Sequence, residues 1–159
     1  MQHFNSKYGV NQPDLPLWMV AEIIPFGAMF TLCNGVEAHI MKKLASSYDV
    51  PDIVLESWLG TLNAIRNICA HHGRLWNRQL GFRPKIPRKR KHPQWHSPVA
   101  IPDNRIFSVL TILKYMLSVV APQSKWPERL YRLLQEYPDV PPRDMGFPID
   151  WELSPLWEK

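Results

Sequence analysis

Two kinds of residue are scarce in this sequence, and each scarcity excludes a class of protein. Of its 159 residues only two are cysteines, Cys33 and Cys69, and both fall within apolar helical patterns. We therefore expect buried thiols in a reducing compartment and no disulfide framework. Residues 57–102 contain no Asp or Glu, which argues against a two-metal nuclease, because such enzymes hold their ions with carboxylates. A Gly-rich phosphate loop and a Gly-x-Ser-x-Gly elbow are also missing.

Signals for export and for membrane insertion are missing as well. No basic, apolar and small-residue leader opens the chain, so we expect a cytoplasmic protein. Residues 15–33 are nearly apolar, but Glu22 and Pro25 interrupt them. We therefore interpret this run as a buried, kinked helix and not as a membrane span.

The sequence does carry helical periodicity along most of its length, with no convincing strand alternation and no internal repeat. We predict helices over residues 18–34 with a kink at Pro25, over 36–46, and from Asp52 onward. We predict two more, one capped by Asp103 and stopped by Pro122, and one from Ser124 to Pro138. The fold class expected is an all-α bundle of about four or five helices in a single domain, residues 1–159. A Pro-rich basic loop (83–102) and an irregular tail (141–159) complete it.

Positive charge is concentrated in the acid-free stretch. Nine of the 19 basic residues lie there, so the rest of the chain holds ten basic residues against 14 acids. Such a local excess of one sign attracts polyanions, of which nucleic acid is the first candidate.

The same stretch contains a polar cluster at the end of the predicted central helix. Leu55, Trp58 and Leu62 belong to its apolar face, and the last two turns carry Arg66, Asn67, His71 and His72. Gly73 stands where a left-handed residue commonly ends a helix.

The spacing of these residues has chemical content. Asn67 and His71 point the same way, whereas Arg66 and His71 diverge by roughly 140° on an ideal helix. They can meet on one phosphate if the last turn unwinds or if a second copy of the helix supplies one of them. A guanidinium that grips phosphate, beside an imidazole that titrates near neutrality, suits phosphodiester cleavage.

The run RNICAH (66–71) is similar to the arginine, polar residue, spacer and histidine pattern of HEPN-domain ribonucleases. The longer run RNICAHHGRLWNR, with LPLWM (15–19) before it and MGFP (145–148) after it, resembles the Abi-like proteins of bacterial abortive infection. The resemblance implies a HEPN-like helical bundle and a metal-independent endoribonuclease in phage defence, or a toxin. It implies catalysis by Arg66, Asn67 and His71, products ending in a 2′,3′-cyclic phosphate, and no cofactor.

The resemblance also implies partners. RNA is the expected substrate, a homodimer with a composite active site is expected, and an antitoxin or regulatory protein is a further candidate. We expect RNA backbone contacts from residues of the motif and of the basic loop, namely Arg74, Asn77, Arg78, Lys85, Arg88, Lys89, Arg90 and Lys91. His92 and His96 lack a Cys or carboxylate at ligand spacing, so no metal site is expected.

Two alternatives stay open at this point. His72 replaces His71 as the active imidazole if the spacer is one residue longer, although it falls back near the apolar stripe. The chain can also be a non-catalytic HEPN-like module that binds RNA or protein within a defence or toxin–antitoxin assembly. Only fourteen residues precede Leu15, so we expect either a short member of the family or one truncated at its N-terminus.

Overall fold

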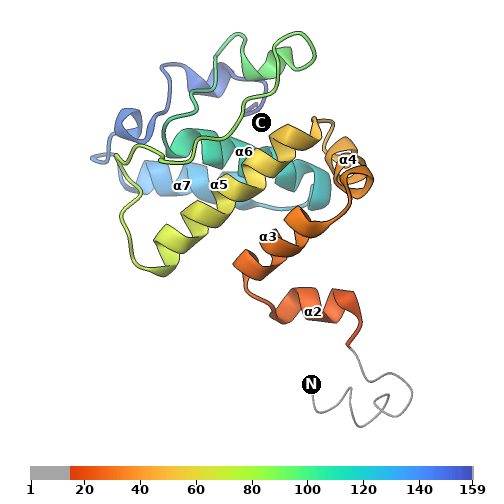
Figure 1. Ribbon diagram of the computed structural model, residues 1–159. Coiled ribbons are helices and arrows are strands. Elements are labelled where there is room, and N and C mark those ends of the chain that lie inside the picture. The colour runs from red at the N-terminus through yellow and green to blue at the C-terminus, as the bar shows by residue number, and fades with distance from the viewer. Residues whose placement is uncertain (1–14, 159) are drawn as a thin grey trace. The chain divides into compact units, whose positions relative to one another are not determined.

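The computed structural model describes residues 15–158, and its regular elements are all helical (Figure 1). Within this range there is no β-strand, so the predicted all-α class is confirmed. The chain divides into two compact units, one ending at Gly35 and the other starting at Val36. No helix of the described part is both long and apolar enough to cross a membrane.

The first unit contains α2 (Leu17–Ile23) and α3 (Phe26–Gly35). We predicted one kinked helix here, but Ile24 has an extended, non-helical backbone (φ −79°, ψ 147°) and separates the two. The residue before a proline is forced away from helical geometry, so Pro25 breaks the path completely. Neither helix buries any of its residues.

The second unit is built on α5 (Asp52–Ala70), which packs against α4 (Ala38–Ser47) and α6 (Ile106–Val120). It also contains α7 (Trp126–Glu136) and the 3-10 turns η1 (Pro93–Trp95), η2 (Pro142–Met145) and η3 (Trp151–Leu153). The predicted start of the central helix is confirmed at Asp52, where Pro51 precedes the first turn.

Some predicted boundaries and burials were wrong. Asp103 does not cap α6; it lies 3.9 Å from the Arg83 guanidinium, and Arg105 precedes the helix. The last helix begins at Trp126, and the hydroxyl of Ser124 accepts a bond from its backbone N–H (3.3 Å). Cys69 is exposed rather than buried.

The core of the second unit is aromatic as well as aliphatic. Trp58 of α5 contacts Trp95 of η1 and Tyr115 of α6, with ring centroids 5.2 and 5.7 Å apart. A second aromatic cluster joins Phe107 of α6 to the C-terminal segment, where Trp157 is 1% exposed. The predicted irregular tail therefore packs tightly, through two 3-10 turns, against the helices.

Candidate functional site at the end of helix α5

The predicted motif lies where α5 ends and the chain turns away. Arg66 and Asn67 are in the last two turns, and His71 is the residue after the last helical one, Ala70. All three are exposed, and the Arg66 guanidinium donates to the Asn67 side-chain oxygen (3.2 Å). The side chains of Arg66, Asn67 and His71 are therefore open to solvent at the C-terminal end of α5.

The helix ends in a Schellman motif, but not at the glycine we predicted. His72, with φ 55°, takes the left-handed position, and its N–H bonds to the Cys69 carbonyl (3.0 Å). The Gly73 N–H then bonds to the Ile68 carbonyl (2.7 Å). These are the two hydrogen bonds that define the motif.

A glycine is needed at position 73 because the backbone there passes close to Ile68, and not because the residue takes a left-handed conformation. A Cβ added there would lie 2.7 Å from Cγ2 of Ile68 and 3.0 Å from its carbonyl oxygen. Hence His72 takes the left-handed position that we had assigned to Gly73, and Gly73 meets a different need that the sequence did not predict. The side chain of His72 is exposed and stands on strained backbone.

Because a left-handed residue with a Cβ is strained, replacing His72 with glycine is expected to stabilise the protein by up to about 1 kcal/mol. The measurement is the free energy of unfolding in urea. His71→Gly is the matched control, since His71 has φ −98° and gains nothing from glycine. A His72→Gly variant no more stable than His71→Gly would contradict the assignment of strain to His72.

The residues that follow the motif divide into free and engaged side chains. Arg74 and Arg78 are exposed, and neither forms an ion pair with another residue that the structure describes. Asn77, in contrast, is left-handed (φ 57°), and its side-chain oxygen accepts a hydrogen bond from Arg105. The same Arg105 nitrogen donates to the Asp144 carbonyl (2.7 Å). Asn77 therefore has a structural role in holding the turn after α5 to the start of α6.

Arg105 was missed in the sequence because it lies far from the motif along the chain. Its packing depends on Gly146 (φ 87°), where an added Cβ would be 2.6 Å from the Cβ of Arg105. No local pattern links these two positions to Asn77. Only the fold brings residues 77, 105 and 146 together.

The basic loop lies away from the motif, although it follows it closely in sequence. The Lys85 N–H donates to the Ser57 hydroxyl (2.8 Å), and the Trp58 indole N–H donates to the Lys85 carbonyl (2.9 Å). Both partners belong to the first half of α5. Ser57 and His71 are fourteen positions apart, which is about 21 Å of helix at 1.5 Å per residue. The loop and the motif therefore occupy opposite ends of α5 (Figure 1).

The loop is anchored at several points by buried residues. Trp95 is 0% exposed and His92 is 4% exposed, and Pro84 and Pro87 are fully buried. The Nε2–H of His96 donates to the Pro87 carbonyl (2.6 Å). His92 and His96 thus belong to the loop's internal support. Among the described residues no three His, Cys, Asp or Glu side chains gather as metal ligands would.

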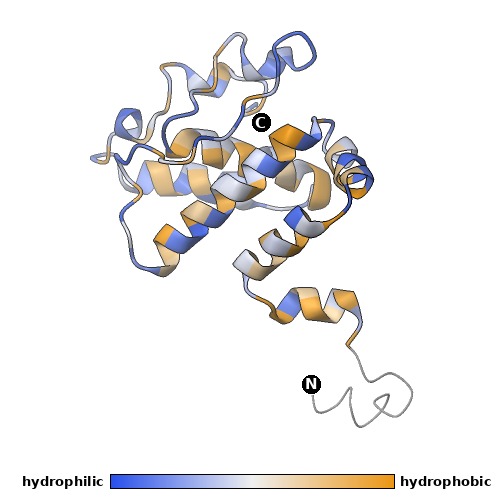
Figure 2. Cartoon of the chain, viewed as in Figure 1, coloured by the Kyte–Doolittle hydropathy of each residue, from blue (hydrophilic) through white to orange (hydrophobic). Residues whose placement is uncertain are grey.

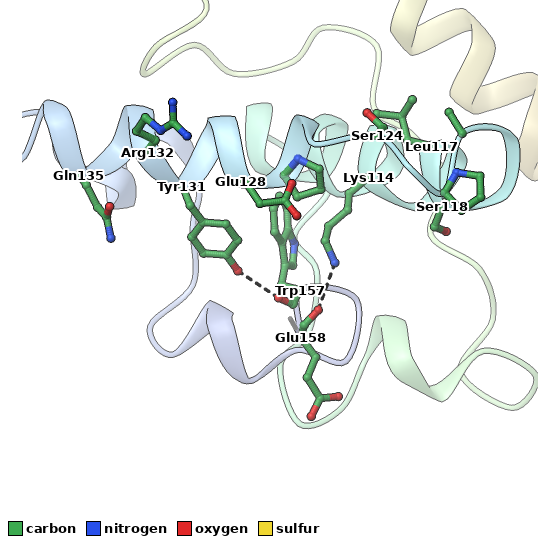
Figure 3. A pocket seen from close by; sticks show the side chains of 13 residues that line it. Lys114, Leu117, Ser118, Ser124, Glu128, Tyr131, Arg132, Gln135, Trp157 and Glu158 are labelled. Carbon is green, nitrogen blue, oxygen red and sulfur yellow. Dashed lines mark hydrogen bonds between the residues drawn. The ribbon is translucent and has the colours of Figure 1, made fainter.

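A pocket of about 550 Å³ exists elsewhere, between α6, α7 and the C-terminal segment (Figure 3). Lys114 and Glu128 line it, and the Lys114 ammonium donates to the Leu156 carbonyl (2.6 Å). Burial lowers the pKa of Lys114, and the Glu128 carboxylate partly opposes that shift. None of the motif residues lines this pocket.

Comparison with known proteins gives one family. The family described as Abi-like protein matches residues 1–77, a range that ends one residue after Trp76. The match therefore includes the whole polar cluster at the end of α5. No curated protein and no solved structure matches the chain.

Proposed function

Since residues 1–77 belong to the Abi-like family, which is associated with phage defence, we propose that the protein is a metal-independent endoribonuclease of that defence. The residues that would act are Arg66, Asn67 and His71. The observation that carries the proposal is that all three are exposed at one helix end. That end belongs to a stretch without a single carboxylate (residues 57–102).

The chemistry assigned to these residues is transfer of the phosphoryl group to the neighbouring ribose oxygen. His71 takes the proton from the RNA 2′-hydroxyl, and the oxygen attacks the adjacent phosphorus. The bond to the 5′-oxygen of the next nucleotide breaks, and that oxygen takes its proton from the imidazolium that His71 has become or from water. The products are a 2′,3′-cyclic phosphate and a 5′-hydroxyl.

Arg66 would stabilise the charge that develops on the phosphate oxygens, because a guanidinium is permanently charged and donates two parallel bonds. Asn67 already accepts a hydrogen bond from Arg66, so it would hold the guanidinium in position. Phosphate contacts from Arg74 and Arg78 would fix the register of the strand.

Helical geometry favours a site shared between two copies of the chain. Arg66 and His71 are five residues apart, so their directions differ by roughly 140°. A two-fold dimer would place the Arg66 of one copy beside the His71 of the other, on one phosphate. A homodimer with a composite site is thus part of the proposal.

The second candidate is a non-catalytic module that binds RNA or a protein partner, such as an antitoxin. Two observations favour it. Arg66 is already engaged with Asn67, and the pockets found in the second unit are lined by other residues. Binding of RNA without turnover, with strong salt dependence, would support this alternative.

Cleavage of single-stranded RNA in EDTA tests the proposal. His71→Ala and Arg66→Ala are each expected to lower the rate at least about 100-fold, the lower range for loss of a general acid or base. His39→Ala is the matched control, since His39 is an exposed histidine on α4, and it is expected to retain full activity. Activity that survives in both motif variants would reject the assignment.

His72→Gly distinguishes between the two neighbouring histidines in the same assay. It relieves the left-handed strain and keeps the helix end folded, so any loss of rate reports on the imidazole itself. Full activity in His72→Gly, together with loss in His71→Ala, would assign the role to His71. The reverse pattern would assign it to His72.

A further inference from the structure

Residues 88–91 (Arg-Lys-Arg-Lys) form a turn, called the basic turn below, whose side chains are all exposed. Backbone bonds close it, from the N–H groups of Lys91 (3.1 Å) and His92 (3.0 Å) to the Arg88 carbonyl. Pro87 and His92, which flank the turn, are both buried. The four cations are therefore held outward on a fixed frame, in the hydrophilic loop at the top right of Figure 2.

The basic turn has no acidic partner within the part of the chain that the structure describes. The two ion pairs found there join His39 to Glu37 and Arg83 to Asp103. Four adjacent cations without a counter-charge on rigid backbone form a ready site for a polyanion, since little ordering entropy is lost on binding.

The positions of Ser57 and His71 around α5 show which edge of the helix joins the loop attachment to the motif. The loop is attached at Ser57, and Ser57 and His71 are fourteen residues apart, close to four full turns. The two residues therefore lie on nearly the same edge of the helix, roughly 40° apart. Asn67 lies near that edge as well, and Gly60 and Ala64, which fall between, have no charged side chain.

We propose that the basic turn is a second nucleic-acid contact, separate from the motif. It would anchor one RNA strand that runs along this edge of α5 to His71. This inference rests on the proposed function for the choice of RNA. It adds a length requirement: a productive RNA must span about 21 Å from the attachment point at Ser57 to His71, plus the reach of the basic turn.

The surroundings of the basic turn favour a nucleic acid over an anionic membrane surface. Peripheral binding to a membrane combines basic residues with large apolar side chains that enter the lipid. No exposed large hydrophobic side chain lies between residues 83 and 118. Within that segment the positive charge has no exposed large apolar side chain beside it, and the nearest one along the chain is Phe82.

The length requirement makes the inference testable by binding alone. With a stacked rise of about 3.4 Å per nucleotide, a strand of about 12 nucleotides covers roughly 40 Å, whereas a trinucleotide covers about 10 Å. The longer strand can reach both ends of α5, and the trinucleotide can contact only one. The probes are 2′-O-methyl oligonucleotides, which bind but cannot be cleaved because the attacking hydroxyl is blocked.

The decisive variant is the full chain with Arg88→Gln, Lys89→Gln, Arg90→Gln and Lys91→Gln. Its matched control carries Lys42→Gln, Lys43→Gln, Lys125→Gln and Arg129→Gln, which are also exposed in the second unit and remove the same charge. We expect the basic-turn variant to bind the 12-nucleotide strand roughly 100-fold more weakly at 0.1 M salt. The logarithm of its binding constant should also depend less steeply on the logarithm of the salt concentration, with a slope smaller in magnitude by about 0.7 for each lost phosphate contact. The control should change little.

The outcomes distinguish this inference from the proposed nuclease. The basic-turn variant should lose more affinity for the 12-nucleotide strand than for the trinucleotide, because a trinucleotide can still bind at the motif whereas the longer strand loses one of its two contacts. Equal loss in the two quadruple variants, or unchanged 12-nucleotide binding, would overturn the inference even if wild type cleaves RNA. If wild type never cleaves RNA but shows the length and turn dependence, the inference stands and the nuclease proposal fails. Binding to phosphatidylserine vesicles in place of RNA would also overturn it.

Discussion

Replacing Trp58 with alanine is expected to lower the free energy of unfolding by about 3–5 kcal/mol, the usual range for removing a buried tryptophan. The side chain is 0% exposed and contacts the rings of Trp95 and Tyr115. Its indole N–H also satisfies the Lys85 carbonyl. The loss therefore combines a cavity in the core with an unpaired carbonyl at the start of the basic loop.

Urea unfolding monitored by circular dichroism measures the effect. Ile53→Ala is the matched control on the same helix, because Ile53 is 53% exposed, and its expected change is within about 0.5 kcal/mol. Trp58→Phe keeps most of the ring packing and loses the indole donor, so we expect an intermediate loss of about 1–3 kcal/mol. If Trp58→Ala were no more destabilising than Ile53→Ala, the described core would be wrong.

The second large effect is expected for Trp157→Ala, near the C-terminus, again about 3–5 kcal/mol. Trp157 stacks on Phe107 with a centroid distance of 5.7 Å, and its indole N–H donates to the Thr111 hydroxyl (2.9 Å). The Thr111 hydroxyl also donates to the Phe107 carbonyl, so truncation leaves it with one partner. Most of the loss is therefore packing of the C-terminal segment onto α6.

Ile149→Ala provides the control in the same segment, because Ile149 is 90% exposed and should change stability by less than about 0.5 kcal/mol. Thermal unfolding of both variants, followed by near-ultraviolet circular dichroism, compares them directly. Near-equal midpoints for the two variants would show that the C-terminal segment does not contribute to the core.

Trp58 links the stability of the core to the RNA binding proposed for the basic turn. The indole of Trp58 donates a hydrogen bond to the Lys85 carbonyl and packs, with its ring tilted, against Trp95, which follows the basic turn. The position of four exposed cations is therefore set by the core and not by the local loop sequence. Exposure of Arg66 and His71 at the other end of α5 is what the nuclease proposal required, since buried side chains could not reach a phosphate.

Much of the helical framework followed from local sequence. The apolar spacing from Leu55 to Ile65 predicted α5, and Pro51 with Asp52 predicted its start. The prediction for Pro25 located the interruption correctly but underestimated it, because the restriction on Ile24 adds to the loss of a hydrogen bond. At the other end of α5 we assigned the left-handed position to Gly73, the residue type that favours it, whereas the structure gives it to His72.

The sequence by itself determined the all-α class, the register of α5 that exposes Arg66, Asn67 and His71, and the concentration of positive charge in residues 57–102. These properties depend on side-chain periodicity and charge over short distances along the chain. Tertiary structure alone decided that the basic loop folds back to the first half of α5, and that Asn77 is held by Arg105. Those arrangements come from hydrogen bonds and ring contacts between residues about 27 or more positions apart, and the periodicity of a single helix contains no information about them.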